Sequence, residues 1–196
     1  MKQIQLLLFS ILLFACSSEH NNEFYLRKSN KELSLLLDSN IKSNTKALFL
    51  YKDEEGKEYI TFQNQYHNEI YFYNFENNQV EFKVTPELEG NNGVGMFFGY
   101  YIQNLDSIFL TNIEVEKIAL IDSSSNLKEQ LVYDKSSDET PLRRSFSTSD
   151  YFRPIRIIGN KIYTISRCDR NKQPNPISIT IDMKTKKVDY LPFNYP

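Results

Sequence analysis

The chain has 196 residues and a formal net charge of −2 at pH 7; it contains 14 Phe and 13 Tyr but no Trp and 6 Gly. This charge does not suggest the basic stripe that nucleic-acid binding normally requires, so no nucleic-acid partner is expected. Aromatic and β-branched residues favour strands, and the plentiful Asn and Ser between them are typical of turns. The length suits one domain or a small pair of domains.

The N-terminus has the layout of a bacterial secretory signal. Lys2 supplies a thin positive region, a largely apolar run covers residues 4–14, and the small residue Ala15 precedes Cys16. The polar tract that follows ends this run well short of the about 18 residues that a membrane-spanning helix needs. We therefore interpret residues 1–15 as a lipoprotein signal peptide; a plain cleaved signal and a buried core helix are the alternatives.

Cys16 is then the expected site of lipidation, by a thioether lipid and by palmitate-type acylation of the new amine. Several acyl chains anchor a protein durably, since each buried methylene contributes about 0.8 kcal/mol. The expected partner is thus a membrane, contacted through the lipid, and the expected location is the outer membrane of a bacterial cell envelope. Residues 16–29 would be the lipidated cysteine and a flexible tether. Cys168 then has no disulfide partner and is expected to fill part of a strand.

Alternating apolar residues bounded by turn signals predict an all-β domain over residues 30–196. One short segment, residues 30–37, is the only candidate helix, and it fits a first strand equally well. The remaining pattern predicts strands at 47–52, 57–62, 69–74, 79–84, 97–103, 107–112, 117–121, 128–133, 155–158, 161–166, 177–181 and 187–191.

The predicted strands fall into three similar units. Each unit opens with a polar turn and an alternating strand, at positions 58, 106 and 160, so the units follow one another at nearly equal intervals. A second alternating strand follows and ends at a polar residue, Asn74, Asp122 or Asp182, before a polar turn and a last strand. Periods of about 40–50 residues with four strands per unit are typical of β-propeller blades. The sequence therefore predicts a partial, about three-blade propeller-like array of four-stranded antiparallel sheets.

An antiparallel β-sandwich is the alternative fold, because its strands also recur every about 8–12 residues. A propeller of about three blades cannot close a ring of the usual four to eight. The domain is therefore expected to be truncated at its C-terminus, or to pair its open edges with another copy.

Several motifs occur in a fixed order: the lipobox ending at Cys16, the Gly-rich turn at 89–95, the segment 104–110 and the closing segment 191–196. In this order they resemble an uncharacterised family of Bacteroidetes lipoproteins with propeller-like repeats, the domain of unknown function 4221. The resemblance implies a fold and a location, with this chain as the N-terminal half of a longer protein. It implies no catalytic residues.

Few residues could carry catalysis. The two histidines are His20, in the tether, and His67, in a predicted turn, and neither lies in a recognised zinc spacing. The acidic turns at 53–55 and 122–126 do not follow the calcium-loop pattern. The segment 93–99 is expected to be a connecting turn, since no strand precedes it and no helix follows it, as a dinucleotide loop requires. No metal, no cofactor and no enzymatic activity are therefore expected.

The arginines are unevenly placed. All but one lie between positions 143 and 170, which distinguishes this segment from the lysine-rich remainder: Arg143, Arg144, Arg153, Arg156, Arg167 and Arg170. Guanidinium groups bind carboxylates, phosphates and sugar hydroxyls and stack on aromatic rings. The cluster is a candidate anion or glycan site; local ion pairing with nearby acids is the alternative.

Together these observations predict a membrane-anchored lipoprotein of unknown function, a non-enzymatic scaffold that binds an envelope protein or a glycan. One alternative is an envelope glycan hydrolase that uses an acidic pair, for which Glu114 and Glu116 would share a strand face. Another is a fragment of a longer propeller that has no function alone.

Overall fold

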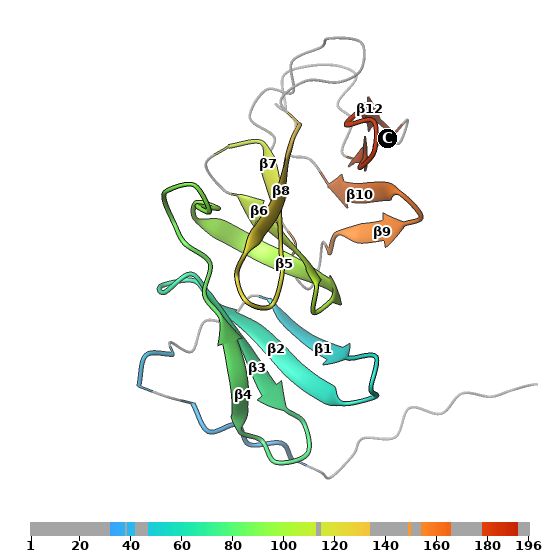
Figure 1. Ribbon diagram of the computed structural model, residues 1–196. Helices are drawn as coiled ribbons and strands as arrows, with labels where there is room; N and C mark the ends of the chain where they lie inside the picture. The colour runs from blue at the N-terminus through green and yellow to red at the C-terminus, as the bar shows by residue number, and fades with distance from the viewer. Residues whose placement is uncertain are drawn as a thin grey trace, which may run out of the picture. The chain divides into compact units, whose positions relative to one another are not determined.

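The computed structural model describes residues 32–37, 39–41, 47–112, 115–133, 149, 154–165 and 178–191. Within these residues the fold is all-β, with twelve strands in three four-stranded antiparallel sheets and no helix (Figure 1). Contacts divide the chain into Met1–Leu33 and Ser34–Pro196, and all three sheets lie in the second unit. Across the described residues, no helix has the length and apolar character to cross a membrane.

Each sheet is a meander in which consecutive strands pair. Sheet 1 consists of β1 (Leu48–Lys52), β2 (Glu58–Asn64), β3 (Glu69–Asn74) and β4 (Val80–Val84). Sheet 2 consists of β5 (Phe97–Asn104), β6 (Ser107–Asn112), β7 (Lys117–Ile121) and β8 (Leu127–Val132). Sheet 3 consists of β9 (Arg156–Ile158), β10 (Lys161–Ile165), β11 (Ser178–Asp182) and β12 (Val188–Tyr190).

The twelve predicted strands are confirmed to within two residues at each end. The all-β class and the grouping into three units of four strands are confirmed with them. The expectation for residues 30–37 was wrong in its described part, because residues 32–37 form neither helix nor strand.

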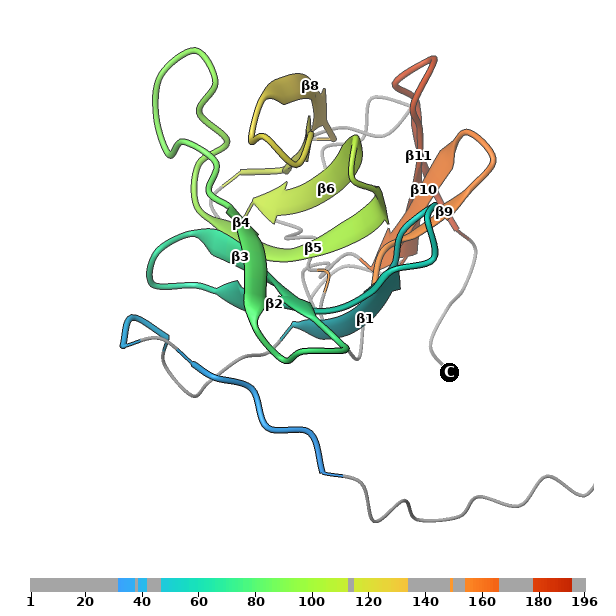
Figure 2. The same ribbon diagram turned by 60° about the horizontal axis from the view of Figure 1, so that its bottom comes forward.

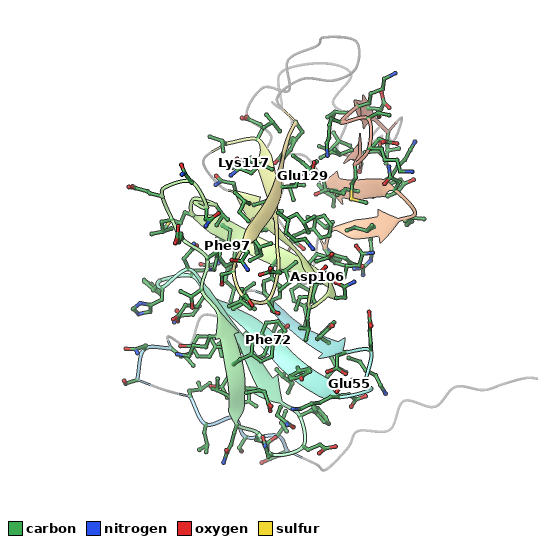
Figure 3. All side chains as sticks on the ribbon, viewed as in Figure 1. Glu55, Phe72, Phe97, Asp106, Lys117 and Glu129 are labelled. Atoms are coloured by element: carbon green, nitrogen blue, oxygen red, sulfur yellow. The ribbon has the colours of Figure 1, made fainter. Side chains whose placement is uncertain are left out.

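Sheets 1 and 2 share a core. Because side chains alternate along a strand, each of these sheets has two apolar faces, a pattern typical of sheets covered on both sides. Phe72 of sheet 1 and Phe97 of sheet 2, both labelled in Figure 3, belong to one buried cluster. The cluster also includes Tyr51, Tyr59, Ile70, Val84, Tyr100, Ile108, Leu110, Ala119 and Ile121.

Buried polar bonds also link sheets 1 and 2. The Gln63 side chain of β2 donates from Nε2 to the Phe97 carbonyl at 2.7 Å and accepts at Oε1 from the Gly99 amide at 2.7 Å. The Tyr100 hydroxyl donates to Thr61 Oγ1 at 2.8 Å. Burial raises the pKa of Tyr100, so this hydroxyl keeps its proton. These bonds fix the position of β5 against β2.

Sheets 2 and 3 share a second core, on the opposite face of sheet 2. Phe109, Ile118 and Leu131 of sheet 2 pack in one buried cluster with side chains of sheet 3, namely Ile162, Ile179, Ile181 and Val188. The inner strands of sheet 2, β6 and β7, are therefore buried on both faces.

The other face of sheet 1, which we call its outer face, carries a stack of aromatic rings. The ring centroids of Phe62 and Tyr71 lie 5.1 Å apart, and those of Phe62 and Tyr73 lie 5.4 Å apart. Leu35 and Ile41 pack on this cluster, and the Tyr73 hydroxyl donates to the Leu36 carbonyl at 2.8 Å.

We call the described residues between 34 and 41 the strap. It is drawn in blue in Figures 1 and 2, beside sheet 1. The Asn64 side chain also donates to it, at the Asn40 carbonyl, 3.2 Å away. Part of the chain that precedes the first strand is thus packed against the sheet.

The turn between the third and fourth strands is built in a similar way in every sheet, although the turn of sheet 2 is one residue shorter than the other two. It begins at Asn74, Asp122 or Asp182, whose Oδ1 accepts backbone N–H bonds from the turn at 2.8–3.0 Å. Each turn then passes through a residue in the left-handed region: Asn78 (φ 58°), Ser125 (φ 68°) or Lys186 (φ 59°). Asn and Asp favour such turns because their side chains bond their own backbone. The internal repeat expected from the sequence is present at this atomic detail.

Candidate functional site: a cleft between two equivalent turns

A cleft of about 420 Å³ lies between the β1–β2 turn of sheet 1 and the β5–β6 turn of sheet 2. These two turns occupy the same position in successive sheets. The lining is rich in carboxylates, and it consists of Tyr51, Asp53, Glu54, Glu55, Asn104, Leu105 and Asp106. Glu55 and Asp106 are labelled on their turns in Figure 3.

The β1–β2 turn is held in shape by Asp53. Its Oδ1 accepts from the Lys57 amide at 2.8 Å, and its backbone carbonyl accepts from the Gly56 amide at 3.1 Å. Gly56 has φ 89°, a conformation that other residues rarely adopt, so the glycine that the sequence places here is needed by the turn. The Tyr59 hydroxyl donates to Asp53 Oδ2 at 3.3 Å. Glu54 and Glu55 consequently project from a fixed turn and are exposed.

The β5–β6 turn is fixed by neighbours from its own sheet. The Asp106 amide donates to Asn104 Oδ1 at 3.0 Å, and the Ser123 amide donates to the Leu105 carbonyl at 2.7 Å. Lys128 of β8 forms an ion pair with Asp106, with 2.7 Å between Nζ and Oδ2. Lys128 thus offsets one of the four acidic charges that line the cleft.

Tyr51 forms the aromatic wall of the cleft. It is 9% exposed and stacks on Tyr59, with ring centroids 6.1 Å apart. Burial raises the pKa of its hydroxyl, and the negative charges of Asp53 and Glu54 raise it further. Tyr51 therefore stays a neutral phenol at physiological pH and serves as a hydrogen-bonding wall rather than as a base.

The cleft is suited to holding a positively charged group. Its carboxylates accept hydrogen bonds and provide negative charge. Among the described residues, no group of three or more His, Cys, Asp or Glu side chains is arranged to hold a metal ion.

Most of the predicted site residues lie outside the described part of the chain. These are Cys16, Arg143, Arg144, Arg153, Arg167 and Arg170, and also Cys168 and Glu114. Arg156 is described: it is exposed at the start of β9, and its Nη1 donates to the neighbouring Ile155 carbonyl at 3.4 Å. His67 is exposed in the β2–β3 turn.

The acidic turn at 53–55 appeared in the sequence as a solvated hairpin turn. Its partner across the cleft, the β5–β6 turn, belongs to the next unit of the repeat, and only the stacking of sheets 1 and 2 brings the two together. The repeat could have predicted that these two turns lie close together, because equivalent turns of successive units lie at the same end of their sheets.

Comparisons with known proteins identify relatives without an assigned activity. A family model described as "Domain of unknown function (DUF4221)" matches residues 21–196. A solved DUF4221 protein from Bacteroides vulgatus is 20% identical, with a TM-score of 0.71, over 83% of this chain and 46% of that chain. A Bacteroides fragilis protein assigned as exported is 10% identical, with a TM-score of 0.56, over 84% of this chain and 42% of that one. This chain thus spans less than half the length of both. No curated protein matched the sequence.

Proposed function

Because this chain belongs to the DUF4221 family, whose name assigns no activity, we propose a function from its geometry: a propeller-type binding scaffold in the bacterial cell envelope. In this proposal the chain is anchored by lipid on Cys16 and holds a ligand without transforming it. Successive sheets act as blades, and their turns form the binding end.

The observation that carries this proposal is the way the sheets stack. Three sheets of one design follow each other along the chain, and sheet 2 shares one buried core with each neighbour. Propellers are built from such serial face-to-face packing of four-stranded meanders, whereas a sandwich pairs two sheets around one core. The likeness to the solved relatives supports the same fold.

The cleft supplies the binding function of the scaffold. It is concave, it lies between rigid turns, and it combines one aromatic wall with carboxylates, which are features of sites that hold small ligands. The ligand chemistry that fits is a primary amine or polyamine, or a lysine-rich peptide segment.

Titration calorimetry of the full chain in a nonionic detergent, with spermine as the probe, tests this function. Glu54→Gln with Glu55→Gln removes two cleft charges. Glu87→Gln with Glu89→Gln is the matched control, because both residues are exposed and lie outside the cleft. We expect the cleft variant to weaken spermine binding by about 10-fold, since each partly exposed charge pair is worth up to about 1 kcal/mol.

Equal weakening by both double variants would show charge attraction without a site and would overturn the cleft assignment. The binding-only character has a separate test. Hydrolysis of envelope glycans by the full chain, lost on one Asp or Glu substitution that leaves the melting temperature unchanged, would refute it.

A further inference from the structure

The strap presents two leucines to solvent. Residues 35–37 are consecutive leucines, and the structure divides them between two sides of the strap. Leu35 packs on the aromatic cluster of sheet 1, whereas Leu36 is 71% exposed and Leu37 is 53% exposed. In Figures 1 and 2 sheet 1 lies on one side of the strap, and no other described segment lies on the opposite side. The described residues therefore leave both of these side chains uncovered.

Contacts with sheet 1 hold the backbone of the strap in place. The Tyr73 hydroxyl donates to the carbonyl of Leu36 itself at 2.8 Å, and the Asn64 side chain donates to the Asn40 carbonyl at 3.2 Å. Tyr73 is fully buried in the ring stack, so its hydroxyl is a donor in a fixed position. Leu36 and Leu37 could turn toward sheet 1 only if these contacts were broken. The strap thus keeps two apolar side chains pointing outward.

We propose that Leu36 and Leu37 dock the strap onto the surface of a phospholipid bilayer, the same bilayer that holds the lipid on Cys16. This inference rests on the proposed lipid anchor. Cys16 precedes the strap in the chain, so insertion of its lipid brings the strap close to the bilayer. The connecting stretch makes docking an intramolecular step, with an effective concentration on the order of millimolar. Two leucines then suffice for a contact that would be weak from free solution.

The stretch just before the strap also suits a bilayer with anionic headgroups. Residues 24–31 contain no acidic residue and include Arg27, Lys28 and Lys31. Basic residues are attracted to anionic headgroups, and apolar side chains near them enter the boundary between headgroups and acyl chains. The chain thus runs from the lipid site through basic residues to the exposed leucines. This order favours a bilayer over a protein as the partner of the strap.

Tryptophan fluorescence tests the docking, because the chain has no Trp of its own. Leu36→Trp and Leu37→Trp each place one reporter on the strap, at positions exposed enough for the fold to tolerate the substitution. The control is Leu88→Trp. Leu88 is similarly exposed, at 52%, in the loop between β4 and β5, which lies away from the strap in Figures 1 and 2.

The full chain carrying its lipid is reconstituted into vesicles of phosphatidylcholine and phosphatidylglycerol, with or without bromine on the acyl chains. Bromine quenches only a tryptophan that reaches those chains. Apolar side chains at a bilayer interface are buried about 5–10 Å into the boundary, so brominated lipid should lower the emission of both strap variants about twofold. Their emission should also move to shorter wavelength on transfer from detergent to vesicles. The emission of Leu88→Trp should change in neither respect.

Unquenched emission from both strap variants overturns the docking if the protein floats with the vesicles in a sucrose gradient, and the lipid anchor then stands. Equal quenching of Leu88→Trp also overturns it, because the contact would not be confined to the strap. Protein that does not float refutes the anchor and the docking together. Neither leucine lines the cleft, so spermine binding by such protein would show that the cleft assignment survives.

Discussion

Gln63 gives the sharpest test of how sheets 1 and 2 are joined. This residue is 1% exposed, and its side-chain amide bonds both the Phe97 carbonyl and the Gly99 amide at 2.7 Å. Gln63→Leu keeps nearly the same volume but removes both bonds. The carbonyl and the N–H of β5 then stay buried without partners.

The expected loss follows from those two backbone groups. Each unpaired buried group costs about 1–3 kcal/mol. Leucine avoids the cost of burying the amide itself, so we expect the free energy of unfolding to fall by about 2–4 kcal/mol. A domain of this size is stable by only about 5–15 kcal/mol. At about 2–4 °C per kcal/mol, the melting temperature should fall by about 10 °C.

Urea unfolding of the full chain, followed by circular dichroism, measures this loss. Gln79→Leu is the matched control, since it is the same substitution at an exposed position just before β4, and it should change stability by less than about 0.5 kcal/mol. If Gln63→Leu were no more destabilising than this control, the inter-sheet bonds would not stabilise the stack, and the proposed scaffold would lose its main support.

Gly99→Ala should prevent folding or cost more than about 3 kcal/mol in thermal melts, because an added Cβ would overlap the backbone carbonyl of Ser149 and Gly99 has φ 100°. Asp122 and Asp182 have lowered pKa values, Asp122 mainly through the side chain of Asn126 and Asp182 mainly through the backbone amide of Thr185. Their stabilisation is therefore present above the unfolded pKa of about 3.9 and is lost as pH falls through the lower folded values. The double replacement by Asn, the residue that sheet 1 has here, should flatten this acid-side loss in urea titrations below pH 4, and an unchanged slope would contradict it. Labelling with a radioactive fatty acid should mark the wild type but not Cys16→Ala; a labelled variant would refute lipidation.

Local chemistry made the sheets predictable. In segments such as β3 and β6, residues that favour strands form a continuous run, and turn-forming residues lie at both ends of each run. The repeat was also visible, because Asn74, Asp122 and Asp182 each close a turn with their own side chain. Such bonds join residues only a few positions apart, so the residue types in a short segment are enough to predict the turn.

Features that join distant segments were not predictable. Gln63 lies one residue beyond the predicted strand at 57–62, and its partners in β5 lie 34 and 36 residues away. The cleft likewise depends on two turns that meet only when the sheets stack. The strap was not predicted, because Leu35 packs on the aromatic cluster of sheet 1, which is distant in the sequence. The residues next to Leu35 in the sequence fit a short helix or a strand.

If Cys16 carries the proposed lipid, the strap limits the distance between sheet 1 and that anchor. Leu35 is packed on sheet 1, so only the stretch from Cys16 to Leu35 separates the sheet from a lipid on that cysteine. At about 3.3–3.6 Å per residue, the contour length of this stretch is at most about 68 Å. With such a lipid in a bilayer, Leu35 would lie no farther than this from Cys16. A ligand held by the cleft would then have to be met within that distance of the membrane plus the extent of the sheets themselves.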